Sequence, residues 1–464
     1  MGFDFQLLEN AGIQLIDGDR GKNYPKHNDF MENGYCLFLS AKNVTKSGFQ
    51  FQETLFINET KDRELRAGKL KYGDIVLTTR GTVGNVAYYD NNNPYKHIRI
   101  NSGMIIIRAD NKLWNPKFLY FILKSELLKE QIINLISGSA VPQLPARDIR
   151  KFILPVINRS LQNKITNIIS DINDKVNLNI EINQTLEKMS QTLFKSWFVD
   201  FDPVIDNALD AGNPIPEALQ ARAELRQKVR NSTDFKPLPA EICSLFPSEF
   251  EETELGWVPK GWTLKSVAKS ININPSLKLP KNKIAKYVDM KSLPTQGYSI
   301  SDIIEKPYSG GAKFQNNDTL FARITPCLEN GKTGFVDFLD EKETAFGSTE
   351  FIVMRGTPQV HYLYVACLAR ESNFRLHAIQ NMIGSSGRQR VQNSCFDSFY
   401  IAIPTPAVMS LFSGKVSSYF DKMYFCNLEN KSLTALRDTL LPKLISGELS
   451  LEALPDLTTD TETA

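Results

Sequence analysis

Basic and polar residues of the kind that contact nucleic acids occur in both halves of the sequence. Arginine can pair with guanine through its planar fork of donors, whereas lysine mainly neutralises phosphate. Glycines beside the charges, as in Arg80-Gly81-Thr82 and Gly387-Arg388-Gln389-Arg390, let the backbone approach a ligand closely. Any one of these residues is more simply a solvated surface charge, but as a set they predict contacts with DNA. The candidates are Lys22, Lys26, Lys42, Arg80, Thr82, Arg147, Lys281, Lys283, Arg323, Lys332, Arg388 and Arg390.

Motifs that carry catalysis are absent or incomplete. Asn330-Gly331-Lys332-Thr333 is similar to the end of a phosphate-binding loop, but Pro326 stands where that loop requires its first glycine. Asn93-Pro94-Tyr95 lacks one proline of the Asp/Asn-Pro-Pro-Tyr/Phe tetrapeptide that adenine-methylating sites need. Gly-x-Ser-x-Gly, His-Glu-x-x-His and Gly-x-Gly-x-x-Gly do not occur. The sequence therefore predicts a non-catalytic protein.

Cysteine and histidine usage predicts no metal site. The 6 cysteines form no Cys-x-x-Cys pair, and the 4 histidines cluster neither with them nor with one another. Scattered cysteines in a chain of this length favour reduced thiols and a cytoplasmic location. The N-terminal residues lack the basic and apolar regions of a signal peptide, and no run approaches the ~20 apolar residues that span a bilayer. We therefore expect no membrane partner.

The sequence repeats itself at an interval of about 245 residues. Asp74 and Asp318 lie 244 apart, and each precedes a short apolar segment with an arginine soon after. Phe152 matches Phe399 at an interval of 247. An interval that drifts by only three residues over about a hundred positions predicts a tandem duplication. Each copy is expected to be a mixed α/β unit followed by a long helix.

Two segments with matching apolar spacing predict the long helices. Apolar residues three and four apart run from Met409 to Leu440, and the same register begins at Ile165. Asn183 and Asn430 fall at equivalent positions of this seam, where a polar residue lowers stability but penalises a wrong register. We predict that the two helices pair in an antiparallel coiled coil with this register. The alternative is that each helix packs only on its own globular unit.

The charge distribution divides the chain further. Residues 1–198 carry 26 Lys and Arg against 20 Asp and Glu, and residues 257–446 carry 23 against 15, whereas 199–256 carry 5 against 12. Two basic regions favour a polyanionic partner, although ordinary surface charge explains them as well. The fold class is thus α+β, with two tandem α/β domains, two long antiparallel helices and pseudo-twofold symmetry. The predicted parts are a first domain (1–156), a central helix (157–198), an acidic proline-containing connector (199–256), a second domain (257–402), a distal helix (403–446) and an acidic disordered tail (447–464).

Several motifs, in this order, resemble one known family. They are the segment Phe246–Trp262, the matched Gly73-Asp-Ile-Val-Leu77 and Asn317-Asp-Thr-Leu-Phe321, and the ending Leu440-Leu-Pro-Lys-Leu-Ile-Ser-Gly-Glu-Leu449. Together with the duplication and the long helices, they make the chain similar to the specificity subunit (HsdS) of type I restriction–modification systems. The resemblance implies that 1–156 and 257–402 are target recognition domains, each reading half of an asymmetric bipartite DNA sequence. The helices would set the unread spacer.

The same resemblance implies partners and cofactors. Two methyltransferase subunits would bring S-adenosylmethionine, and restriction/translocase subunits would use ATP and magnesium, so that this chain binds no cofactor itself. Two other hypotheses remain open on the sequence. One is a scaffold whose long helices assemble proteins with only incidental DNA contact. The other is a stand-alone nuclease with a degenerate carboxylate site.

Overall fold

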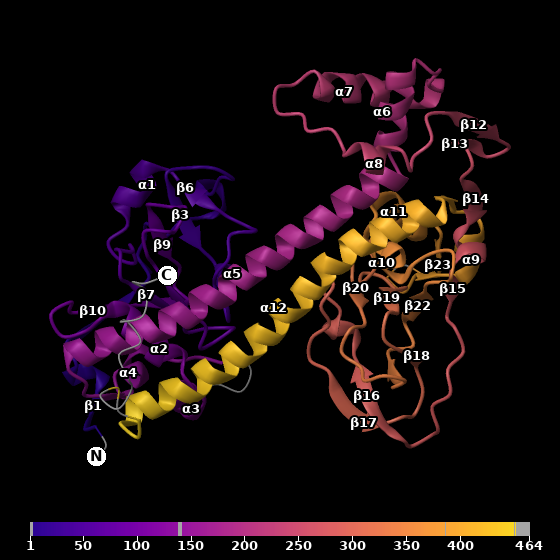
Figure 1. Ribbon diagram of the computed structural model, residues 1–464. Coiled ribbons are helices and arrows are strands. Elements are labelled where there is room, and N and C mark those ends of the chain that lie inside the picture. The colour runs from indigo at the N-terminus through magenta and orange to yellow at the C-terminus, as the bar shows by residue number, and fades with distance from the viewer. Residues whose placement is uncertain (1–2, 138–141, 386, 450, 452–464) are drawn as a thin grey trace, which may run out of the picture. The chain divides into compact units, whose positions relative to one another are not determined.

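The computed structural model describes residues 3–137, 142–385, 387–449 and 451, which form two compact units (Figure 1). The first unit contains residues up to 176 and those from 431 onward, and the second contains residues 177–430. Two long helices, α5 (Arg159–Phe198) and α12 (Pro406–Ser446), each contribute residues to both units. They end where the sequence predicted and begin two and three residues later.

In the first unit, a four-stranded antiparallel sheet has the strand order β2-β10-β7-β8. Ile75 and Leu77 of β7 share a core with Phe118 of α2, whereas Val76 packs with Leu37 of β3. Because side chains alternate along a strand, this sheet is buried on both faces, which explains why β7 reads as a continuous apolar run. The elements are β1 (Phe5–Leu7), β2 (Ile13–Asp17), β3 (Cys36–Leu39), β4 (Val44–Thr45), β5 (Gly48–Phe49), β6 (Phe56–Ile57), α1 (Glu59–Glu64), β7 (Ile75–Thr78), β8 (Val86–Tyr88), β9 (Ile98–Ile100), β10 (Met104–Ala109), α2 (Pro116–Lys124), α3 (Glu126–Leu135), α4 (Ala146–Ile149) and β11 (Ile153–Pro155).

The second unit repeats this arrangement. Its four-stranded sheet has the order β15-β22-β19-β20, and Phe321 and Leu320 of β19 again face two different cores. Strand β16 is parallel to β21 as β3 is to β9, and β14 pairs with β25 as β1 pairs with β11. The elements are α6 (Asp202–Ala211), α7 (Gln220–Arg230), α8 (Ala240–Cys243), β12 (Phe250–Thr253), β13 (Gly256–Pro259), β14 (Thr263–Ser266), α9 (Val267–Ser270), β15 (Asn272–Ile273), β16 (Ile284–Val288), β17 (Ile304–Pro307), β18 (Ala312–Phe314), β19 (Thr319–Ala322), β20 (Thr333–Phe335), β21 (Ala345–Gly347), β22 (Phe351–Arg355), α10 (Tyr362–Arg370), α11 (Ser372–Gln380), β23 (Met382–Ile383), β24 (Arg390–Val391) and β25 (Tyr400–Ile403). The predicted duplication of a mixed α/β unit followed by a long helix is confirmed.

The repeated aspartates hold the two sheets together. Arg108 of β10 donates two hydrogen bonds to Asp74, of 2.7 and 2.6 Å, and Arg355 of β22 donates two to Asp318, of 2.6 and 2.7 Å. Asp74 is 1 % exposed and Asp318 is 0 % exposed. Each carboxylate also accepts a backbone N–H from three residues earlier, which closes the turn before β7 or β19. The shared Gly/Asn-Asp motif is therefore structural, because it ties that turn to the neighbouring strand.

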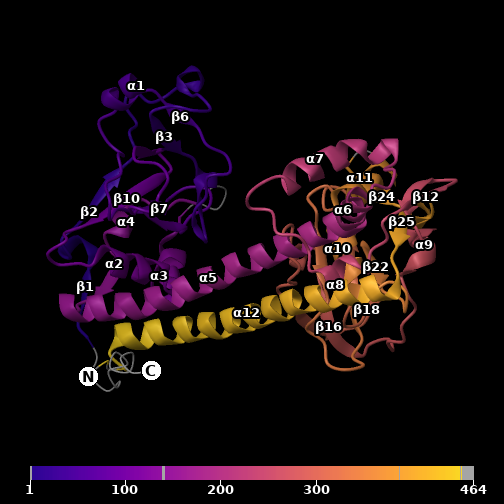
Figure 2. The same ribbon diagram turned by 45° about the horizontal axis from the view of Figure 1, so that its top comes forward.

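The long helices contact each other in an antiparallel sense within each unit. In the second unit, Asn179 donates to Asn430 over 2.9 Å and Asn183 donates to Asn427 over 2.8 Å. Figures 1 and 2 show α5 and α12 side by side. In the first unit, Arg437 donates to Asn173 over 3.0 Å. Both residues predicted to set the register, Asn183 and Asn430, thus lie between the helices, each bonded to a further asparagine. The coiled-coil geometry and the pseudo-twofold symmetry stay predictions.

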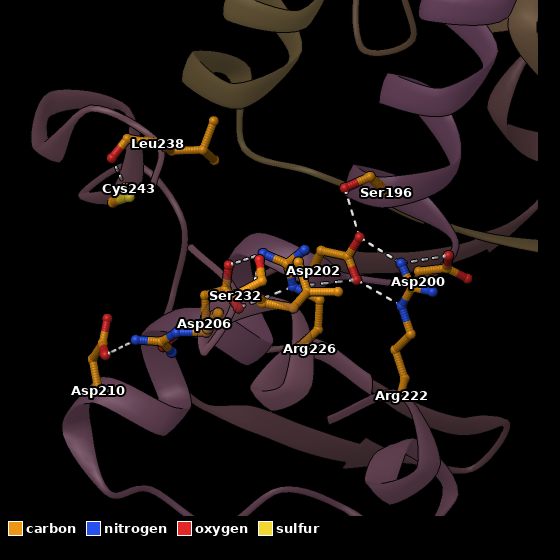
Figure 3. Close-up of polar contacts among 12 residues, drawn as sticks. Ser196, Asp200, Asp202, Asp206, Asp210, Arg222, Arg226, Ser232, Leu238 and Cys243 are labelled. Atoms are coloured by element: carbon orange, nitrogen blue, oxygen red, sulfur yellow. Dashed lines mark hydrogen bonds and ion pairs between the residues drawn. The ribbon is translucent and has the colours of Figure 1, made fainter. Parts of the chain in front are cut away.

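The segment 199–256, predicted as an acidic connector, is a folded part of the second unit. Helix α7 lies beside α6, and Arg222, Arg226 and Arg230 are ion-paired with Asp202, Asp206 and Asp210 (Figures 2 and 3). In each pair the two residues are 20 positions apart, and from one pair to the next both partners advance by four residues. The two helices therefore run parallel. Val204 of α6 is buried in the same core as Trp197. The acidic charge of α6 therefore serves to fasten α7.

Two further predictions concern the C-terminal tail and the absence of membrane-spanning helices. The tail, 447–464, lies outside the described residues except for 447–449 and 451, so its predicted disorder stays a prediction. A search of the described helices finds none with the length and apolar character to cross a bilayer.

Removing Arg355 should destabilise the second unit. Burial, the largest influence, raises the pKa of Asp318, and the hydrogen bonds from Arg355 and the Gln315 N–H oppose this rise. Arg355→Met leaves the carboxylate buried without its cation, so we expect the free energy of unfolding to fall by about 3–5 kcal/mol in urea titrations at pH 8. Without Arg355 the folded-state pKa of Asp318 rises further, so the protein tolerates the neutral acid and the deficit should shrink as the pH is lowered toward 5.

Arg63→Met provides the control, because Arg63 forms an exposed ion pair with Glu59 on α1. Its effect should stay within about 0.5 kcal/mol. Equal losses for both variants would show that the Asp318–Arg355 pair has no special structural role.

Candidate nucleic-acid interface

In the first unit, three chain segments meet at one edge of the four-stranded sheet. The β7–β8 loop (79–85) begins with Thr79, whose N–H donates to Gly103 O over 2.8 Å, just before β10. The Leu144 N–H in turn donates to Thr79 O over 3.0 Å, and Arg80 forms a β-bridge with Gln143. Gln143 and Leu144, which precede α4, are thereby fastened beside the β7–β8 loop. This edge carries two of the predicted DNA contacts, Arg80 and Thr82, both exposed.

The β7–β8 loop is ordered by its own hydrogen bonds. The Thr78 hydroxyl donates to Thr82 O and accepts the Asn85 N–H over 2.9 Å, and the Asn85 amide donates to Val44 O. Gly81 has a φ of 74° and open space around it, as a tight turn requires. Within the described residues, the Arg80 guanidinium has no hydrogen-bond or ion-pair partner. The loop therefore presents a fixed backbone with a cation available to a ligand.

The second unit builds the same edge with different side chains. The Arg323 N–H donates to Glu350 O over 3.0 Å, and the Val391 N–H donates to Arg323 O over 2.9 Å, which joins the β19–β20 loop to the hairpin β23–β24. The Arg390 guanidinium donates to Glu350 over 2.7–3.0 Å through Nε and Nη2, and these bonds raise the pKa of Arg390. Arg388 is exposed at the hairpin loop. Three arginines are thus gathered at this edge.

Comparisons with known proteins cover nearly the whole chain. The family model described as the type I restriction modification DNA specificity domain matches residues 11–188. The HindI specificity subunit of Haemophilus influenzae is 26 % identical over 457 residues, which cover 93 % of this chain and 98 % of that protein. The MjaIX specificity subunit of Methanocaldococcus jannaschii is 24 % identical over 82 % of this chain and 79 % of that protein. Over nearly its whole length, the chain is therefore similar to the specificity subunits (HsdS) of type I restriction–modification systems. A crystal structure of the S subunit from M. genitalium has the same fold, with a TM-score of 0.50, 13 % identity and 96 % of each chain covered.

The arginines of the two edges are one residue out of register. Leu144 bonds to Thr79 as Val391 bonds to Arg323, so Thr79 and Arg323 are the equivalent residues. Arg80, bridged to Gln143, then corresponds to Ile324, which is bridged to Arg390. In the first unit, the arginine of this bridged pair is on the loop (Arg80). In the second unit, it is on the facing strand (Arg390).

Lys332 is used inside the protein. Its half-buried ammonium group donates to the carbonyls of Met290 and Lys291 over 2.8 and 3.3 Å, so this charge has acceptors within the fold, and its contact with DNA stays a prediction. Arg323 is also partly engaged, since it donates to Val391 O over 2.8 Å. Backbone carbonyls at the ends of these loops need hydrogen-bond donors. The long cationic side chains of Lys332 and Arg323 provide such donors where no backbone N–H does.

The other candidates are exposed and lie outside the two loops. Lys42 is paired with Glu53 over 2.6 Å, and Arg147 lies 3.5 Å from Asp148. The remaining four are on the loops that lead from β2 to β3 and from β15 to β16. They are Lys22, Lys26, Lys281 and Lys283, and their DNA contact stays a prediction.

Sequence reasoning missed Glu350 and Arg20. Glu350 orients Arg390, but an acidic residue in a DNA-facing loop gives no positive signal in the sequence. Arg20 bonds to Asp17 over 3.0 Å and lies close to Ser102 O, at the same edge as Arg80. Among the described residues, no group of three His, Cys, Asp or Glu side chains is placed to hold a metal ion.

Arg80 and Lys332 should separate binding from stability. Arg80→Ala should weaken binding to a cognate duplex by about 1–3 kcal/mol if the contact is to a base, with no change in the unfolding temperature. Lys332→Met should lower the free energy of unfolding by about 1–3 kcal/mol, because two carbonyls lose their donor, and should leave DNA affinity intact. Fluorescence anisotropy and thermal unfolding measure the two effects. A reversed pattern would contradict the interface.

Proposed function

We propose that this protein reads an asymmetric bipartite DNA target, one unit per half-site, and directs adenine methylation or restriction by partner subunits. The observation that carries the proposal is the repeated sheet edge, which bears ordered, arginine-containing loops in both units. Arginine on an ordered loop suits recognition of guanine in the major groove, and phosphate contacts from neighbouring lysines would fix the orientation of the duplex.

The asymmetry of the target follows from differences between the edges. The same bridge joins Arg80 to Gln143 in one unit and Ile324 to Arg390 in the other. Glutamine pairs with adenine, arginine with guanine, and isoleucine with neither, so the two edges would select different bases. A duplicated fold with divergent loops supports a target whose halves differ in sequence.

The paired helices would fix the unread spacer. Helix α5 has 40 residues, which corresponds to a length of about 60 Å. Half-sites about one helical turn (~34 Å) apart are typical of proteins that read one face of a duplex at two places. The asparagine contacts between the helices support a single register and therefore a single spacer length.

Apolar side chains exposed on the helices support docking of two identical partners. Leu178 and Phe425 are 50 % and 62 % exposed, and Met189 and Leu436 are 44 % and 47 % exposed. Each of these pairs is 247 residues apart, the interval of the duplication. On each helix the two residues are 11 apart, or about three turns, and so share a face. We assign these faces to two methyltransferase subunits, which would bring S-adenosylmethionine, while restriction/translocase subunits would bring ATP and magnesium.

Methylation mapping tests the bipartite target. A host expressing the chain with its methyltransferase subunit should show methylated adenines in a motif of two short sequences with a constant gap. Arg80→Ala should relax one half of that motif and Arg388→Ala the other, because they lie on different edges. Arg63→Ala, a change of an exposed arginine on α1, is the matched control and should leave the motif unchanged. A single continuous motif would refute one half-site per unit.

Partner stoichiometry tests the helix faces. Leu178→Asp with Met189→Asp should remove one of the two methyltransferase subunits, and Phe425→Asp with Leu436→Asp the other, because a buried carboxylate disrupts an apolar contact. Native mass spectrometry should then report one partner per chain. Gln184→Asp, at an exposed polar position of α5, should retain both. Two partners bound to either double variant would exclude these faces as docking sites.

A further inference from the structure

An isoleucine is exposed on the hairpin at the DNA-facing edge of the second unit. Ile383 of β23 is 66 % exposed, although it is a large β-branched residue and lies on a strand. It is paired with Arg390 of β24, so their side chains lie next to each other on one face of the hairpin. A solvated apolar side chain in this place needs an explanation, because a polar residue would fit the strand equally well.

The hairpin holds Ile383 in a defined position. Gly384 has a φ of 136°, and a Cβ there would lie 2.9 Å from Arg388 O, so the chain turns tightly directly after Ile383. The Thr325 N–H donates to Gln389 O over 3.1 Å, and the Gln389 N–H donates to the Thr325 hydroxyl over 3.1 Å. These bonds fasten the hairpin to the β19–β20 loop. A β-branched side chain on a fastened strand has little rotational freedom, so its methyl groups have a fixed direction.

The neighbours of Ile383 are cationic. Arg390 is held by Glu350, and Arg388 is exposed, with a guanidinium that has no hydrogen-bond or ion-pair partner among the described residues. A ligand that fits this face must be apolar at one point and anionic or rich in acceptors around it. The major groove of DNA meets both demands at a thymine, whose C5-methyl group lies among phosphates and base acceptors.

The first unit provides an internal comparison. Ser137 is bridged to Gln143 there as Ile383 is paired with Arg390, and Gln143 lies beside the β7–β8 loop as Arg390 lies beside the β19–β20 loop. The equivalent of Ile383 is therefore Ser137, an exposed polar residue. At this position the second unit has an apolar side chain and the first unit a polar one, as expected of a residue that selects a base in one half-site.

We infer that Ile383 contacts the C5-methyl group of a thymine in the half-site read by the second unit, beside a phosphate or guanine bound by Arg388. The inference rests on the proposed function and names one of its specificity-determining residues. The contact is apolar and selects thymine against cytosine and uracil, which lack the methyl group.

Replacing thymine by uracil tests the contact, because only the methyl group is removed. The chain, in complex with its methyltransferase subunits, is titrated with its mapped target duplex and with duplexes carrying uracil at one thymine at a time. One substitution in the second unit's half-site should weaken binding about fourfold, the factor that corresponds to ~0.8 kcal/mol per buried methyl-sized group. In Ile383→Ser the same substitution should have no effect, whereas uracil in the other half-site should act equally on both proteins.

Ile133→Ser is the matched control, since Ile133 is 69 % exposed on α3 of the first unit. It should retain the full sensitivity to uracil. A half-site without thymine, or a uracil effect that persists in Ile383→Ser, would overturn the inference. Weaker binding of Ile383→Ser to all duplexes alike would also overturn it, in favour of a wedge between base pairs. Failure of the wild-type complex to select any bipartite duplex would instead refute the proposed function.

Discussion

The ion pair of a buried carboxylate in each four-stranded sheet is the interaction on which the two arginine-bearing edges depend. Asp74 and Asp318 are almost fully removed from solvent, and a buried charge is tolerated only with a paired and hydrogen-bonded partner. Arg108 and Arg355 supply that partner from the adjacent strand. The bond between them fixes where β7 and β19 begin relative to their neighbours, and therefore where the β7–β8 and β19–β20 loops leave the sheet. These ion pairs therefore determine the positions of the arginines at the edges.

The aspartate–arginine pair is repeated in both units, whereas the loops differ. This contrast explains how one fold can read two sequences. The sheet order, the ion pair and the bonds Leu144–Thr79 and Val391–Arg323 are the same in both units. The side chains on the loops, by contrast, differ between the two units. Arg80 of the first unit, for example, corresponds to Ile324 of the second. Stability and specificity are thus carried by different residues, so loop substitutions can change the target without loosening the sheet.

The sequence predicted what depends on spacing and missed what depends on partners from distant strands. The duplication, the long helices and the place of Asp74 and Asp318 follow from periodicity, and the structure confirms them. Arg108 and Arg355 also lie 247 residues apart, at the interval of the duplication. Nothing in the sequence pairs either arginine with its aspartate, however, because only the strand pairing brings the two side chains together. Lys332 looked like a free charge, since its acceptors are two carbonyls about forty residues away. The pairing of α6 with α7 was hidden for the same reason, and the segment was interpreted as an acidic proline-containing connector.

The hydrogen bonds between asparagines of α5 and α12 oppose a slip of one helix along the other. A slip of one helical turn displaces one helix along the other by about 5.4 Å. Base pairs follow one another at about 3.4 Å along the duplex, so such a slip would misplace a half-site by more than one base pair. An apolar seam tolerates slips of this kind, because one leucine packs much like the next. Asn179 is fully buried and donates to Glu429 and Asn430, and a slip would leave its buried amide without these partners. The loss of stability that buried asparagines cause is therefore the cost of a spacer with a single length.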